Sequence, residues 1–200
     1  MHELFSFLNL LYPDIQENPA ALRWTRRDNP RAQPGDPRFP HVATTFRLTE
    51  HHTAGGMSRW LPWLAELQPE MFAEIDPVLA AKEGIEDGGW MTISSPRAEI
   101  VARARVTDRM RPLRIDRTTI HQIGLPWHWG PGGPVPGDAA NDLVVLSGDP
   151  NTSIHEAKAF VVNVRAGRDS SGTSKLAGIR DTPPGVAPDK DHPAEFDDHG

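Results

Sequence analysis

The chain has 200 residues, which is enough for one domain of ordinary size. Its formal net charge of −6 argues against nucleic acid as a partner, because a domain that binds a duplex normally presents a basic face. Cysteine is absent, which excludes a disulfide framework, a thiolate nucleophile and thiolate-held zinc or iron–sulfur centres.

The two ends of the chain are predicted to lie outside the core. Residues 1–38 contain several prolines and form an arm or linker. The apolar start, MHELFSFLNLLYP, lacks the basic residues that open a secretory signal, so we expect a cytoplasmic chain and assign this stretch to partner docking or burial. Residues 167–200 are polar and rich in Pro and Gly, so they are expected to be disordered. No apolar run approaches the ~20 residues that a membrane span needs.

The central region opens with a strand and a helix on either side of a polar stretch. Residues 42–48 alternate enough to form a strand, and residues 58–67 are predicted to form a short helix. The apolar face of that helix, at spacing i, i+3, i+4 and i+7, holds Trp60, Trp63, Leu64 and Leu67. Between the two elements, TTFRLTEHHTAGGM at 44–57 gathers more hydrogen-bonding side chains than packing requires. We predict that this stretch holds a polar, phosphate-bearing or heterocyclic ligand.

The next elements are a short strand at residues 72–75 and a helix that follows it. Asp76 suits the N-cap of this helix, Pro77 suits its first position, and Gly84 ends it. Further strands are predicted at residues 90–94, 99–107, 143–146 and 159–164, and residues 112–122 are predicted to form an extended pair. In the strand at 99–107, alternation places on one face Ile100, Ala102, Ala104 and Val106. Short helices between crossing strands favour a small closed barrel. A doubly wound nucleotide fold is disfavoured, because G-x-G-x-x-G and regular strand–helix alternation are absent.

Several stretches of the central region carry a family resemblance when they are taken in order. They are FPHVATTFRLTEHH at 39–52, PEMFAEIDPVLAAKEGIEDGGWMTISSPRAEI at 69–100, GLPWHWG at 124–130, GDAANDL at 137–143 and EAKAFVVNV at 156–164. Residues 39–166 thus resemble the C-terminal molybdopterin-dinucleotide-binding domain of the formate dehydrogenase major subunit, in the molybdopterin oxidoreductase family. The resemblance implies a mainly β fold, a six-stranded double-psi β-barrel with short helices.

The resemblance also implies what the domain does and what it lacks. The family oxidises formate at molybdenum or tungsten held by two pterin dinucleotides, and a selenocysteine or cysteine ligates the metal. Those ligands lie in other domains of the full subunit, and this chain has no cysteine. We therefore expect a module that binds molybdopterin guanine dinucleotide and is inactive alone. Its partner would be the catalytic portion of a formate dehydrogenase, which carries the metal and the iron–sulfur clusters.

Two other functions stay open at this point. The first is an interaction or assembly module whose cofactor site is vestigial. The second is an autonomous enzyme on a similar barrel, which is disfavoured because the chain has neither a Gly-Ser cleavage dipeptide nor a G-x-S-x-G motif.

The resemblance maps cofactor contacts onto the polar stretch. Arg47, Thr49, His51 and Thr53 match the family's first cofactor-contacting segment. An Arg fork suits a pyrophosphate, and Thr and His suit the donors and acceptors of a pterin edge. Without the resemblance, the same residues would be interpreted as a solvated strand end. His51 and His52 point to opposite faces of an extended segment, so we do not expect them to share a metal ion.

Three further residues complete the predicted cofactor site. In PWHWG, period two places two tryptophans on a core face and His128 toward the ligand, although the run would also suit a strand that only buries its rings. Asn141 follows a glycine-rich loop, and its amide can match a pterin edge, as the resemblance also implies. Lys158 matches a family lysine close to the cofactor, and would equally suit a solvated position.

Overall fold

The structure is a computed structural model that describes residues 32–130, 134–145, 154–155, 157–168 and 175–176. Most of the predicted arm and most of the predicted tail therefore lie outside the described residues. Within the described part, no helix combines the length and the apolar character that a membrane crossing demands.

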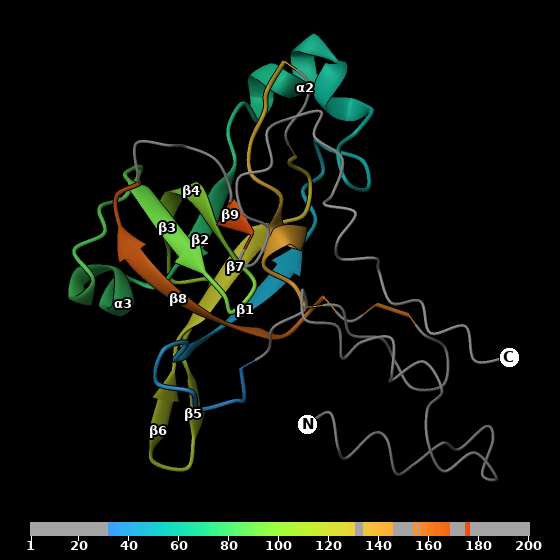
Figure 1. Ribbon diagram of the computed structural model, residues 1–200. Helices are drawn as coiled ribbons and strands as arrows, with labels where there is room; N and C mark the ends of the chain where they lie inside the picture. Colours follow the sequence, from blue (N-terminus) through green and yellow to red (C-terminus); the bar gives the residue numbers. More distant parts are fainter. Residues whose placement is uncertain (1–31, 131–133, 146–153, 156, 169–174, 177–200) are drawn as a thin grey trace, which may run out of the picture.

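Six strands close into a barrel (Figure 1). They are β1 (His41–Phe46), β2 (Phe72–Ile75), β3 (Trp90–Ser94), β4 (Ala98–Val106), β7 (Gln122–Pro126) and β8 (Phe160–Ala166). Their order is β2-β7-β1-β8-β3-β4, and β4 also pairs with β2, which closes the ring. The β1–β7 and β2–β4 pairs are parallel, and the other four are antiparallel. The predicted mainly β, six-stranded barrel is confirmed.

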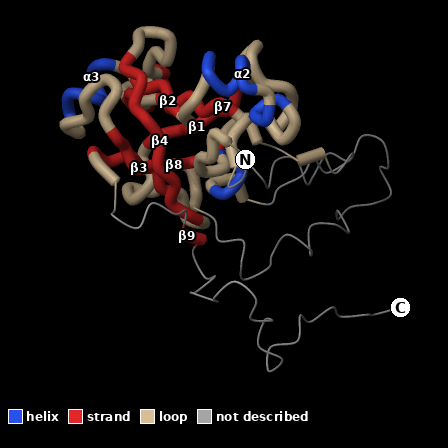
Figure 2. The backbone as a smooth tube through the Cα atoms, turned by 90° about the horizontal axis from the view of Figure 1, so that it is seen from above, coloured by secondary structure: helices blue, strands red, loops and turns tan. Residues whose placement is uncertain are grey.

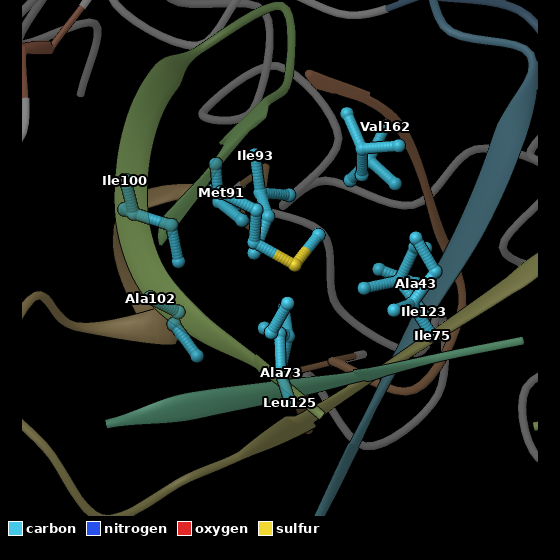
Figure 3. Packing of buried hydrophobic residues seen from close by; sticks show 14 of the residues in the cluster. Ala43, Ala73, Ile75, Met91, Ile93, Ile100, Ala102, Ile123, Leu125 and Val162 are labelled. Atoms are coloured by element: carbon cyan, nitrogen blue, oxygen red, sulfur yellow. The ribbon is translucent and has the colours of Figure 1, made fainter. Parts of the chain in front are cut away.

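Alternation along the strands fills the barrel interior. In β4 the even-numbered residues from Ala98 to Ala104 are buried, while the residues between them are only partly buried. Figure 3 shows Met91, Ile93, Ile100 and Val162 pointing into the same interior. Several alanines line the interior beside these larger side chains, so the barrel is a packed core and a rigid support for its loops.

The helix α3 (Pro77–Lys82) begins and ends as its sequence predicts. The Asp76 carboxylate accepts hydrogen bonds from the N–H groups of Val78 and Leu79 at 3.0 and 3.1 Å. Gly84 follows the helix with a φ of +64°, the left-handed conformation common just after a helix. The other carboxylate oxygen of Asp76 lies 2.7 Å from Nδ1 of His121, which ties the helix to the barrel.

The segment at residues 58–67 differs from its prediction. A 3-10 turn, η2 (Ser58–Trp60), and a short helix, α2 (Pro62–Leu67), replace the single predicted helix. Leu61 between them is extended and Pro62 starts α2, because proline suits the first helical position and restricts the residue before it. In both Figure 1 and Figure 2, α2 and α3 occupy different sides of the barrel.

The predicted strand at residues 143–146 also differs, whereas the predicted extended pair at residues 112–122 is confirmed. Leu143 and Val144 are fully buried but follow the 3-10 turn η3 (Ala140–Asp142) in a turn. Their N–H groups donate to carbonyls of η3 at 3.2 Å, so they need no sheet partner. Within 112–122, β5 (Leu113–Ile115) and β6 (Thr118–Ile120) form a separate hairpin. Outside the closed ring, β9 (Lys175–Leu176) pairs with β4.

Candidate cofactor-binding site at the end of β1

Parallel pairing brings two distant segments to the same end of the barrel. β1 and β7 run side by side in register, with Phe46 opposite Pro126. The next N–H along, that of Trp127, donates to the carbonyl of Phe46 at 3.1 Å. We call residues 47–57, between β1 and η2, the polar loop. This loop and the PWHWG segment after β7 therefore leave the sheet side by side.

His128 fastens the polar loop at two points. The N–H of Leu48 donates to Nε2 at 2.7 Å, so Nδ1 carries the proton and donates to the carbonyl of Thr53 at 2.6 Å. The ring is completely buried, and this burial lowers the pKa of His128 below its usual value. His128 is therefore a neutral connector that fixes both ends of residues 48–53.

His51 and Ser58 form a second fastening. The N–H of His52 donates to the Ser58 hydroxyl at 3.0 Å, and that hydroxyl donates to Nδ1 of His51 at 3.2 Å. The other ring nitrogen of His51 donates to the carbonyl of Gln68 at 3.4 Å. The buried His51 ring also meets the edge of Trp129, with 5.3 Å between ring centroids. Ser58 thus links the polar loop to the start of η2.

The turn at residues 53–55 has a backbone that few residue types accept. Thr53 has a φ of +49°, an uncommon value for a β-branched residue, and Gly55 has a φ of +74°. A Cβ added to Gly55 would lie 2.1 Å from the carbonyl oxygen of His128. Arg59 joins this turn to the segment after β7, because its N–H donates to the carbonyl of Gly55 at 3.0 Å and its Nη1 donates to the carbonyls of Gly130 and Val135 at 3.3 and 3.4 Å. Strain of this kind often accompanies a functional site.

Two cations lie at the opening of the loop. The exposed Arg47 guanidinium lies 5.5 Å from the Trp127 ring centroid, and the Lys158 ammonium donates to the carbonyl of Thr45 at 2.5 Å. Loss of hydration against this backbone lowers the pKa of Lys158, and the charge of Arg47 lowers it further. Across the described residues, neither cation has a carboxylate partner within salt-bridge distance. Two adjacent cations of this kind favour an anionic ligand.

The structure brings together six of the seven predicted site residues. They are Arg47, Thr49, His51 and Thr53 on the polar loop, His128, which is hydrogen-bonded to that loop, and Lys158, which is hydrogen-bonded to Thr45 at the end of β1. Asn141 is exposed in η3, which packs beside β4. The side chains of Arg47, Thr49, Thr53, Asn141 and Lys158 are open to a ligand, whereas both His51 and His128 are buried and use their ring nitrogens within the protein.

Direct ligand contact by His128 would require one of its two hydrogen bonds to break. The pattern prediction for PWHWG therefore needs refinement, because His128 is buried as fully as Trp129. Sequence reasoning also missed Gly55, Ser58 and Arg59 as loop supports. The available signal was two polar residues that closely follow a Gly-Gly turn, at the start of a mostly apolar segment.

Comparison with known proteins agrees with this geometry. The family profile described as "Molydopterin dinucleotide binding domain" matches residues 42–161. The formate dehydrogenase subunit alpha of Megalodesulfovibrio gigas is 43% identical over 148 residues, which cover 74% of this chain and 14% of that protein. The formate dehydrogenase-O major subunit of Escherichia coli (strain K12) is 43% identical over 157 residues, which cover 78% and 15% respectively. Among solved structures, acetylene hydratase from Pelobacter acetylenicus has a TM-score of 0.49 at 15% identity, covering 64% of this chain and 18% of that chain.

The closed barrel presents a fixed polar loop beside two exposed cations that have no carboxylate partner among the described residues, and this arrangement is that of a ligand-holding module. The chain belongs to the molybdopterin dinucleotide-binding domain family, and the matched range runs from β1 into β8 and contains all seven predicted site residues. Its similarity to formate dehydrogenase is confirmed. The chain spans only about 15% of the length of these relatives. The donor set fits the family's ligand class, because guanidinium and ammonium groups suit a pyrophosphate and hydroxyl and amide groups suit a heterocycle.

Proposed function

We propose that this chain is the molybdopterin guanine dinucleotide-binding C-terminal domain of a formate-dehydrogenase-like oxidoreductase. The observation that carries the proposal is that two exposed cations, which have no carboxylate partner in the described part of the chain, lie beside a loop that buried histidines hold in place. In this proposal the molybdenum or tungsten, its protein ligand and the iron–sulfur clusters belong to other polypeptide. The chain is one part of the enzyme and is inactive alone.

Each site residue then has a distinct task. Arg47 and Lys158 hold the anionic pyrophosphate, because together they concentrate positive charge at the loop opening. Thr49, Thr53 and Asn141 offer hydroxyl and amide groups to the edges of the pterin or the guanine. His51 and His128 keep the loop in shape. When bound, the cofactor supplies the redox chemistry, and the residues of this chain bind and orient it.

The nucleotide half of the cofactor gives a direct test. We expect GDP to raise the Tm of the full chain more than CDP, because both share a pyrophosphate but only one has guanine. Arg47→Gln should weaken GDP binding about tenfold or more, the usual cost of losing a charge-assisted hydrogen bond. Arg114→Gln, on the exposed hairpin β5–β6, is the matched control. Equal affinities of the Arg47→Gln and wild-type chains for GDP would contradict the proposal.

One observation favours the alternative of an interaction module with a vestigial site. Large apolar side chains are exposed on η2 and α2, as a docking surface would require. The two functions are separated by adding molybdopterin guanine dinucleotide to the chain in the presence of the catalytic portion of a formate dehydrogenase. A failure of the dinucleotide to raise the Tm under these conditions would favour the interaction module.

A further inference from the structure

The segment at residues 57–67 buries polar side chains and exposes apolar ones. Ser58 and Arg59 are 4% and 7% exposed and face the barrel, where they hold the polar loop. The residues that point outward, with their exposed fractions, are Met57 (69%), Trp60 (63%), Leu61 (53%), Trp63 (82%) and Leu67 (64%). We call these five residues the α2 patch. In Figure 1, α2 stands away from the barrel, at the far side from the β5–β6 hairpin.

This arrangement reverses the usual amphipathic pattern. A surface helix normally buries its apolar face, because burial of apolar area is the main favourable term in folding. Single exposed apolar residues are ordinary, but five large ones within eleven consecutive residues mark an interaction site. Tryptophan is also the residue most enriched among those that dominate the affinity of protein interfaces. The α2 patch is therefore a surface shaped for a protein partner.

We propose that the α2 patch is the docking surface for the catalytic portion of a formate-dehydrogenase-type subunit. This inference rests on the proposed function and names the surface through which the two parts join. The relatives extend far beyond the matched segment, which covers 14% and 15% of their lengths, so a large body remains to cover this face. The partner presents an apolar surface with hydrogen-bond acceptors at its rim for the indole N–H groups.

Continuity with the cofactor loop supports this occupant over any other. The patch begins at Met57, and the next residue, Ser58, is hydrogen-bonded to the ring of His51 and the backbone of His52. A body that completes the cofactor pocket beside Arg47 and Thr49 must approach the same end of the barrel. Docking on the α2 patch would place that body there, and the Ser58 contacts would couple docking to the geometry of the loop.

The test measures association between the full 200-residue chain and a relative's catalytic portion. The probe is the M. gigas formate dehydrogenase subunit alpha without the segment that aligns with this chain, and rebinding of its own excised segment is the positive control. The test variant is Trp60→Gln/Trp63→Gln/Leu67→Gln. The matched control is Leu113→Gln/Ile115→Gln, which removes exposed apolar side chains from the distant hairpin. Affinities are measured by biolayer interferometry, and the Tm of each variant alone is recorded.

We expect the wild-type chain and the hairpin variant to bind equally, and the triple variant to bind at least tenfold more weakly with an unchanged Tm. Unchanged affinity of the triple variant, or no binding by the wild-type chain, would overturn the inference. The inference would also be overturned if either of two other partners covered the α2 patch. One is a second copy, seen as a dimer of the wild-type chain that the triple variant loses in analytical ultracentrifugation. The other is the apolar stretch at residues 1–12, seen as a higher affinity for the probe when that stretch is deleted.

The outcomes also separate this inference from the proposed function. If docking depends on the α2 patch but Arg47→Gln has no effect on GDP binding, the docking inference is supported and the cofactor-binding function is contradicted. If GDP binding depends on Arg47 but docking does not depend on the α2 patch, the cofactor-binding function is supported and the docking inference is contradicted.

Discussion

Two buried histidines fix the shape of the polar loop through side-chain hydrogen bonds. His128 accepts from one backbone N–H and donates to one backbone carbonyl, five residues apart in the loop. His51 does the same with a serine hydroxyl and a carbonyl. Because both rings are buried, each bond lies in a low-dielectric environment where an unmade bond is costly. Loop geometry therefore depends on the hydrogen bonds of these two imidazoles.

Replacing His128 should release the loop without opening the barrel. His128→Phe keeps a ring of similar size but leaves the Leu48 N–H and the Thr53 carbonyl without their partner. We expect a loss of about 1–3 kcal/mol of stability in urea unfolding, together with faster amide exchange at Leu48. His52→Phe is the control, because the His52 side chain is exposed. Unchanged protection of the Leu48 amide in His128→Phe would contradict this role.

A different histidine should make the fold sensitive to acid. His41 is 4% exposed, and its ring nitrogens have no hydrogen-bond partner among the residues that the structure describes. Burial, with smaller effects from the charges of His121 and Lys82, lowers the pKa of His41 from 6.5 to about 4. As the pH falls, His41 therefore takes up a proton in the unfolded chain before it does so in the folded chain. The contribution of His41 to the free energy of unfolding is complete above pH 6.5 and is lost between pH 6.5 and 4.

The His41 contribution lost over this range should amount to about 3 kcal/mol. Urea unfolding at several pH values between 7 and 4 measures this loss. In His41→Phe the free energy of unfolding should depend less steeply on pH, and in the control His52→Phe it should depend on pH as in the wild-type chain. The account is wrong if the wild-type chain and His41→Phe lose stability in parallel over this range.

At the scale of elements, local patterns predicted most strands but not which face of the segment at 58–67 packs against the barrel. Alternation predicted one face of β4, on which Ile100, Ala102 and Ala104 are buried and Val106 is partly buried. The Asp-Pro and Gly signals fixed both ends of α3. Periodicity also identified which residues of 58–67 share a face. It could not say what that face meets, because a repeat of 3.6 residues describes one segment and not its neighbours. The structure turns Trp60 and Trp63 outward, while Ser58 and Arg59 anchor the segment.

The turn between β1 and η2 offers a prediction at this scale. Gly55→Ala combines a left-handed φ with a Cβ that would meet the His128 carbonyl, so the turn and the His128 segment must move apart. We expect a loss of roughly 2 kcal/mol or more in urea unfolding and weaker GDP binding. The control is Gly56→Ala, where an added Cβ would meet nothing within 4 Å. Equal stability of the two variants would show that the close approach at Gly55 does not constrain the turn.

At the scale of the whole molecule, parallel pairing of β1 with β7 creates the site. The two strands are separated by about 75 residues, yet their ends leave the barrel side by side and place Arg47 against Trp127. No local pattern in either strand specifies this partner, so the residues alone predicted strands and only the family resemblance predicted which segments would meet. For the same reason, the bonds from His128 to the loop could not be anticipated.

The α2 patch lies at this same scale, since the chain spans only a small part of its relatives. A domain whose pocket is completed by a second body is expected to carry both an anion site and an apolar docking surface, and we propose both for this chain. The two are connected through Ser58, so docking and cofactor binding should strengthen each other.

The most direct test of the cofactor role is a carbon-13 NMR titration of the lysine side chains with and without GDP. In the free chain, the pKa of Lys158 should lie below its usual value, because it loses hydration and lies near the charge of Arg47. A pyrophosphate held between these two cations should raise the pKa of Lys158. A pKa of Lys158 that stays the same while GDP binds would contradict the account.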